Sequence, residues 1–114
     1  MLRPYVIGGE IMDDQLKKRI EDQIKSKKVF LYMKGTPSAP QCGFSARVAA
    51  VLQEKGVDFG SFNIFEDETI RQGVKEYADW PTFPQLYVNG ELVGGCDIVM
   101  ELNESGELAK ILGK

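Results

Sequence analysis

Residues 29–65, VFLYMKGTPSAPQCGFSARVAAVLQEKGVDFGSFNIF, contain the pattern that decides the fold. The run VFLYM at 29–33 is short, apolar and rich in aromatic side chains, which fits a strand that is buried on both faces. Residues 34–41 follow with one glycine and two prolines, and we expect no regular structure there. The first strand therefore leads through an irregular loop into the next element.

A helix and a second strand complete this unit. From Cys42 onward apolar residues recur at helical spacing, and Gly56 favours the end of the helix. Residues 57–65 contain the second strand, centred on 62–64. A β-α-β unit implies two parallel strands joined by a right-handed crossover.

Amphipathic helices are expected on both sides of this unit. Residues 13–26 place apolar side chains at helical spacing between charged ones, and Asp13 or Asp14 can cap this helix. Asp67 starts another helix. The apolar face of that helix consists of Ile70, Val74 and Tyr77.

The C-terminal part predicts a turn followed by a β-hairpin. Residues 80–84 contain two prolines and form the turn, whereas QLYV at 85–88 reads as a strand. Asn89-Gly90 is the strongest short hairpin signal, and it connects that strand to another one at 91–93.

A final helical stretch covers residues 97–112 and is broken near Gly106. The order is then α, β-α-β, α, β-β, α. The parallel pair and the antiparallel hairpin together predict an α/β fold, with a mixed four-stranded sheet flanked by helices. This is the thioredoxin-like architecture, in one domain over residues 13–114.

Composition excludes several functional classes. The chain has 114 residues, 43% hydrophobic and 27% charged, which is ordinary for one globular domain. A net charge of −3 is a poor match to a nucleic-acid binder, and no apolar run is long enough for a membrane span. Histidine is absent, which excludes Ser-His-Asp triads and histidine-bound zinc or haem.

The N-terminal segment, residues 1–12, has no role that its residues reveal. It lacks the basic-then-apolar layout of a secretory signal. The chain has only two cysteines, and they do not form the dense framework of a small secreted domain. We therefore expect the cytosol or an organelle matrix, mitochondria included, rather than secretion.

Cys42 is the candidate reactive group. It lies where a helix begins, and free N–H groups and the helix dipole favour an anion there, so the pKa of the thiol should be lowered. Lys34 adds a second positive influence. The alternative is that Cys42 is a small buried hydrophobic residue. Ser45 holds the place that the second cysteine of a C-x-x-C pair would take, so Cys42 needs an external thiol or a metal cluster as its partner.

Two segments carry a family resemblance. KGTPSAPQCGFS at 34–45 and WPTFPQLYVNGELVGGCD at 80–97 resemble monothiol glutaredoxins of the CGFS class, in the right order and spacing. The resemblance implies a thioredoxin-like fold, glutathione as cofactor, and a 2Fe-2S cluster that bridges a homodimer. In that arrangement Cys42 is both the catalytic thiol and the metal ligand, and Gly43 and Phe44 contact glutathione beside it.

The remaining glutathione contacts follow the shape of the tripeptide. The resemblance implies that Lys34 and Arg71 hold the glycine carboxylate. Taken alone, Lys34 could be a solvated charge, and Arg71 could pair with Glu68 or Asp67 on its own helix.

Thr82-Phe83-Pro84 would offer an extended backbone edge to the ligand, and the resemblance implies a cis bond before Pro84. Trp80 and Phe83 could equally be packing aromatics, and Trp80 is assigned to packing.

The start of the last helix suits the other end of glutathione. Gly95 and Cys96 place free N–H groups where the γ-glutamyl carboxylate would bind, while Asp97 can face the ammonium group. Asp97 could instead act as an ordinary N-cap. Cys96 either forms a disulfide with Cys42 under oxidation or packs near the site.

Three functions remain open. The resemblance favours a carrier of the 2Fe-2S cluster in iron-sulfur protein maturation, with BolA-like proteins and acceptor apoproteins as partners. The second is a glutathione-dependent thiol-disulfide oxidoreductase that uses Cys42 as nucleophile. The third is a thioredoxin-fold adaptor without chemistry.

Overall fold

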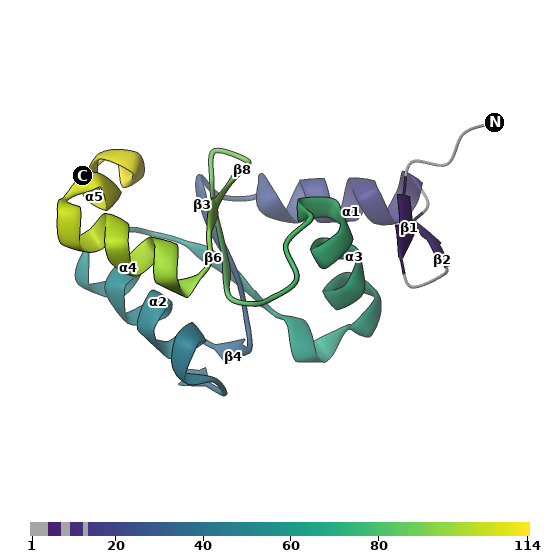
Figure 1. The fold of residues 1–114 in the computed structure, drawn as a ribbon, viewed down its shortest axis with the longest axis horizontal. Helices are drawn as coiled ribbons and strands as arrows, with labels where there is room; N and C mark the ends of the chain where they lie inside the picture. Colours follow the sequence, from purple (N-terminus) through teal and green to yellow (C-terminus); the bar gives the residue numbers. More distant parts are fainter. Residues whose placement is uncertain (1–4, 8–9, 13) are drawn as a thin grey trace.

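The computed structural model describes residues 5–7, 10–12 and 14–114, with side chains from residue 14 onward. A central sheet separates two layers of helices (Figure 1). One layer contains α2 (Gly43–Glu54), α4 (Cys96–Ser105) and α5 (Glu107–Leu112). The other contains α1 (Asp14–Ile24) and α3 (Glu68–Ala78).

The sheet has four strands in the order β6-β3-β7-β8, and β3 lies inside it. Its strands are β3 (Val29–Met33), β6 (Gly60–Asn63), β7 (Gln85–Val88) and β8 (Glu91–Gly94). β3 pairs parallel with β6 and antiparallel with β7, which pairs antiparallel with β8. The predicted mixed four-stranded sheet of a thioredoxin-like fold is confirmed.

Strand β3 is buried along its whole length, as its apolar run predicts. Because side chains alternate along a strand, Leu31 and Met33 belong to the cluster with α2, α4 and α5, whereas Phe30 and Tyr32 face α1 and α3. The two hydrophobic cores thus lie on opposite faces of one strand. The end of that strand leads directly to Lys34 and, through residues 35–41, to Cys42.

Helix and hairpin signals were confirmed at most positions. Asp67 caps α3 by accepting the N–H groups of Thr69 and Ile70. Asn89 and Gly90 both have positive φ, as a two-residue hairpin turn requires. The last helix is broken at Gly106, which has a φ of 85°. Of the two predicted caps of α1, Asp13 lies outside the described residues.

Three predictions from the sequence were wrong in detail. The loop at 34–41 was expected to be irregular, but β4 (Gly35–Thr36) pairs antiparallel with β5 (Ala39–Pro40). So short a hairpin tolerates proline, because the ladder continues through the N–H of Gln41, which donates to Lys34 O at 2.9 Å.

The second strand ends earlier than predicted. β6 stops at Asn63, and Ile64–Glu66 form a 3-10 turn, η1. Asn63 Oδ1 accepts the N–H groups of both Phe65 and Gly35, at 3.0 Å each. The N–H of Phe65 therefore bonds to this side chain and not to a neighbouring strand. The same amide ties the end of β6 to the loop that precedes Cys42.

The third difference concerns α4, whose N-cap is Gly95 and not Asp97. The helix begins at Cys96, so the reading of Asp97 as an ordinary N-cap is wrong. Its side chain is exposed and lies within the first turn of α4.

Two further features concern the ends and the surface of the molecule. The strands β1 (Tyr5–Ile7) and β2 (Glu10–Met12) form an antiparallel hairpin beside α3.

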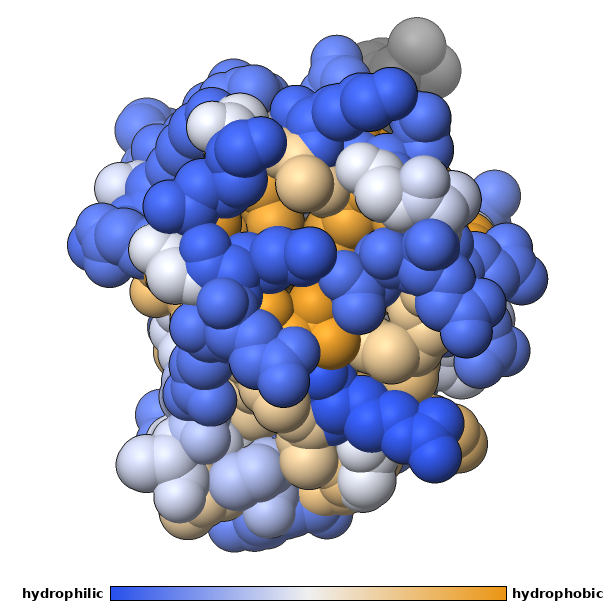
Figure 2. Space-filling model, turned by 90° about the vertical axis from the view of Figure 1, so that its left-hand side faces the viewer, coloured by the Kyte–Doolittle hydropathy of each residue, from blue (hydrophilic) through white to orange (hydrophobic). Residues whose placement is uncertain are grey.

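Figure 2 views the end that carries α5, where most of the surface is hydrophilic and apolar side chains show between charged ones. None of the helices in the described part of the chain is long and apolar enough to cross a membrane.

Candidate functional site

Cys42 is the N-cap of α2 and is half-buried. In the thiol form Sγ makes no capping hydrogen bond. The backbone N–H of Ser45 nevertheless lowers the pKa of Cys42, partly opposed by desolvation, and the N–H of Phe44 and the charge of Lys34 lower it further. The predicted lowering by helix start and lysine is confirmed, and a buried, inert Cys42 is not what the structure shows.

Ser45 occupies the position of the second cysteine of a C-x-x-C pair, and its hydroxyl oxygen already accepts a hydrogen bond. Its side chain is 0% exposed, and Oγ accepts the N–H of Lys34 at 3.0 Å. This hydrogen bond joins the first turn of α2 to the end of β3. It thereby holds both the thiol and the lysine in place.

A cleft of about 310 Å³ opens beside the thiol, within the size range of small-molecule sites. Three segments that are distant in the sequence form it: the end of β3, the first turn of α2, and the approach to β7 with the start of α4. Its lining residues are Lys34, Phe44, Trp80, Thr82, Phe83, Pro84, Gly95, Cys96, Asp97 and Ile98. Eight of these were predicted as site residues. Trp80 and Ile98 were not.

The approach to β7 is fixed by a buried amide. Gln85 is 0% exposed, and its Nε2 donates to Trp80 O at 3.0 Å and to Thr82 O at 3.2 Å. Its Oε1 accepts the hydroxyl of Tyr87 at 2.9 Å. The Phe83-Pro84 peptide is cis, as the resemblance implied.

The start of α4 contributes backbone to the cleft. A Cβ at Gly95 would lie 3.3 Å from both Pro84 O and Trp80 Nε1, a tight fit that favours glycine at this position. Cys96 is buried, and burial raises the pKa of its thiol. Cys42 is close enough to raise that pKa further, but both cysteines are free.

Three predicted site residues, Cys42, Gly43 and Arg71, are not among the residues that line the cleft, although Phe44, two positions after Cys42, is. Arg71 on α3 pairs weakly with Glu68 at 3.4 Å, as the alternative reading foresaw, yet its Nε is buried with no partner in the described part of the chain. Gly43 is exposed, and a Cβ there would meet nothing within 4 Å. The structure thus gives no steric reason for glycine at position 43.

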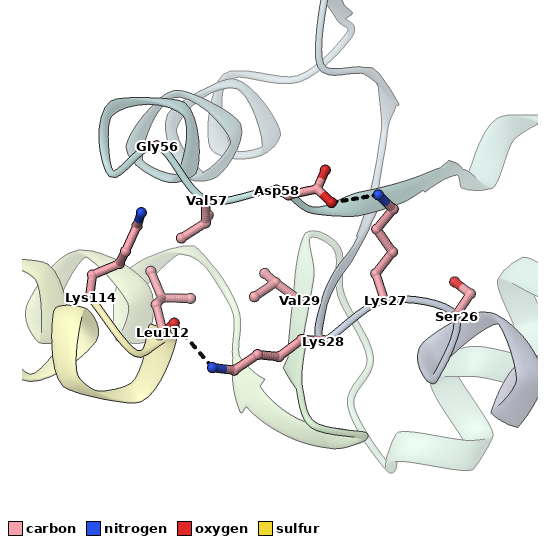
Figure 3. A pocket seen from close by; sticks show the side chains of 9 residues that line it. All are labelled: Ser26, Lys27, Lys28, Val29, Gly56, Val57, Asp58, Leu112 and Lys114. Carbon is pink, nitrogen blue, oxygen red and sulfur yellow. Dashed lines mark hydrogen bonds and ion pairs between the residues drawn. The ribbon is translucent and has the colours of Figure 1, made fainter.

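A larger cavity, of about 500 Å³, lies at the opposite end of β3 (Figure 3). It is lined by Ser26, Lys27, Lys28, Val29, Gly56, Val57, Asp58, Leu112 and Lys114. Lys27 pairs with Asp58 at 2.6 Å, and Lys28 donates to Leu112 O at 3.4 Å. These ammonium groups neutralise an acidic side chain and a helix C-terminus, so we assign the chemistry to the smaller cleft beside Cys42.

Comparison with known proteins identifies the family. A family model described as glutaredoxin matches residues 29–93. The chain belongs to the glutaredoxin family. Its similarity to the mitochondrial monothiol glutaredoxin-5 of Lachancea kluyveri, 51% identity over 112 residues, covers 96% of this chain and 78% of that protein. This places it among the monothiol glutaredoxins, in agreement with Ser45.

Other relatives support this assignment. Monothiol glutaredoxin-S11 of rice is 56% identical over 99 residues, which are 87% of this chain and 20% of that protein, so the chain spans about a fifth of its length. The solution structure of a monomeric truncated mutant of Trypanosoma brucei 1-C-Grx1 matches with a TM-score of 0.78 and 45% identity. That match covers 85% of this chain and 88% of the other, which confirms the thioredoxin-like fold.

Besides Ile98, the sequence did not reveal two contributors to this glutaredoxin site, Trp80 and Gln85. Trp80 was assigned to packing, but it lines the cleft, and its Nε1 is buried without a partner in the described part of the chain. Gln85 was read only as a strand residue. A signal for it existed, because a glutamine beside the apolar run LYV in a buried strand must find hydrogen-bond partners.

Proposed function

We propose that this monothiol glutaredoxin binds glutathione in the cleft and carries a 2Fe-2S cluster that Cys42 and the glutathione thiol ligate together. The observation that carries the proposal is a single thiol of lowered pKa beside an open cleft, with a buried serine where a second thiol would stand. Such a thiol needs a sulfur partner from outside the chain.

The cleft suits an anionic tripeptide. Lys34 offers an ammonium group at the end near the thiol, and Arg71 has an unpartnered buried Nε on the adjacent helix. At the other end, the start of α4 exposes N–H groups that favour a carboxylate, and Asp97 can accept from an ammonium group. These charges match the glycine carboxylate, the γ-glutamyl carboxylate and the amino group of glutathione.

The cluster, as cargo, fits a shared thiolate set. A 2Fe-2S cluster takes four thiolates, whereas Cys96 is buried with a raised pKa and leaves Cys42 as the one suitable cysteine. The described residues hold no group of three or more side chains that could bind a metal. Two chains and two glutathione molecules would complete the set, which makes a homodimer the cluster-bound form.

The remaining assignments follow from this role. We propose BolA-like proteins and iron-sulfur acceptor apoproteins as partners, and a glutathione-containing compartment, such as the mitochondrial matrix, as the location. The name of the L. kluyveri relative supports that compartment.

A second function is favoured by the lowered pKa of Cys42. As an oxidoreductase, the Cys42 thiolate would attack the glutathionyl sulfur of a mixed disulfide and release the substrate thiolate. A second glutathione thiolate would then attack the new Cys42–glutathione disulfide, which yields glutathione disulfide and regenerates Cys42. Turnover coupled to glutathione reductase would reveal this activity, and Cys42→Ser would abolish it.

Anaerobic reconstitution with iron, sulfide and glutathione tests the proposed function. Wild type should acquire the visible absorption of a 2Fe-2S cluster and elute as a dimer. Cys42→Ser should stay colourless and monomeric, whereas the matched variant Cys96→Ser should behave like wild type. A cluster retained in Cys42→Ser would remove Cys42 as a ligand.

A further inference from the structure

We propose that Gln85 is a positioning residue for glutathione: its buried amide turns the peptide between Thr82 and Phe83 so that the Phe83 N–H points into the cleft. This inference rests on the proposed function, because glutathione is the ligand that would accept the N–H. It gives a role to a buried polar side chain that lies behind the cleft and not in its lining.

Every group of the Gln85 amide is engaged. Nε2 donates one hydrogen bond each to the carbonyls of Trp80 and Thr82, and Oε1 accepts a hydrogen bond from the Tyr87 hydroxyl. Burial raises the pKa of Tyr87, so its hydroxyl keeps the proton that it donates. The amide is thereby oriented without ambiguity, since only this orientation satisfies all three contacts.

The direction of the Phe83 N–H follows from peptide geometry. The C=O of Thr82 and the N–H of Phe83 belong to one trans peptide, in which the two groups point in opposite directions. Because the Thr82 carbonyl points back to Gln85, the Phe83 N–H points away from Gln85. Thr82 and Phe83 both line the cleft, so this is the cleft side.

The Phe83 N–H is also free to bind. Within residues 14–114 it donates to no acceptor, although Phe83 itself is buried. A buried backbone donor without a partner is rare, and a peptide ligand that lies along this edge would supply the acceptor. Without Gln85, the peptide would be free to rotate and the donor would lose its fixed direction.

Calorimetry with reduced glutathione and the reduced 114-residue chain tests the proposal. Gln85→Met keeps the side-chain size but removes all three hydrogen bonds. We expect its affinity for glutathione to fall about tenfold, the worth of one oriented hydrogen bond. Leu108→Ala is the matched control, because Leu108 on α5 is fully buried in the core and does not line the cleft. It should lower the unfolding midpoint without changing affinity.

A spectroscopic readout separates positioning from general stability. In wild type the Phe83 amide resonance should move on addition of glutathione, and in Gln85→Met this movement should be lost. If Gln85→Met does not fold, Tyr87→Phe decides, since it removes only the bond to Oε1 and should weaken binding about two- to threefold.

Each outcome points one way. Unchanged affinity in Gln85→Met, or in Tyr87→Phe where that variant decides, overturns the positioning role. An equal loss of affinity in Leu108→Ala does so as well. Wild type that fails to bind glutathione at all contradicts the proposed function itself, which is a different result.

Discussion

Replacement of Ser45 by alanine should lower the free energy of unfolding and raise the pKa of the Cys42 thiol. Ser45 Oγ accepts the N–H of Lys34 at 3.0 Å in a fully buried position. Alanine removes the acceptor and leaves the N–H without a partner, which costs about 1–3 kcal/mol. The Ser45 hydroxyl is also one of the groups that lower the pKa of Cys42, so that pKa should rise in the variant.

Urea unfolding, followed by the fluorescence of Trp80, the only tryptophan of the chain, measures the first effect. Ser38→Ala is the matched control, because its hydroxyl is exposed and makes only a 3.4 Å contact with Thr36; it should change stability by less than about 0.5 kcal/mol. The rate of Cys42 alkylation against pH measures the second effect. Equal unfolding midpoints for the two variants, together with an unchanged pH profile, would show that the Ser45 hydroxyl stabilises neither the fold nor the Cys42 thiolate.

Four further predictions concern the loop, a cap and the thiols. Gly35→Ala should lower stability by about 2–4 kcal/mol in urea, because φ is +89° and a Cβ would lie 2.6 Å from loop backbone; a loss below 1 kcal/mol would contradict this. Asp67→Ala should cost about 1–2 kcal/mol by thermal unfolding, since it removes the cap of α3 and the ion pair with Arg19; an unchanged melting temperature would argue against the cap. Iodoacetamide at neutral pH should label Cys42 before Cys96, as mass spectrometry would show, because the pKa of Cys42 is lowered and that of Cys96 is raised. The pKa of Cys42 in the folded chain lies below the ordinary value of 9.0. The thiolate should therefore stabilise the fold fully above pH 9.0, relative to Cys42→Ser, and this stabilisation should fade as the pH falls through the folded pKa. The opposite trend would contradict the lowered pKa of Cys42.

The elements with strong local signals were predictable. Asn89-Gly90, Asp67 and Gly106 each act on the backbone within a few residues, so local chemistry alone locates their turns and caps. The run at 29–33 predicted a strand buried on both faces, because all of its residues are apolar or aromatic and none is charged.

What the sequence could not supply depends on contacts between distant segments. The early end of β6 depends on Asn63, which accepts an N–H from the loop at Gly35. The role of Gln85 depends on the path of the chain from Trp80 to Thr82 around it. The separation of Arg71 from the cleft lining is likewise a matter of how α3 packs, which helical periodicity does not specify.

In the proposed carrier, Cys42 shares the 2Fe-2S cluster with the thiol of bound glutathione. The most direct test is the amount of glutathione in the reconstituted, gel-filtered wild-type protein, measured after acid release and compared with iron and sulfide. We expect one glutathione for each chain in the cluster-bound dimer. A cluster of full absorbance with no glutathione attached would contradict it.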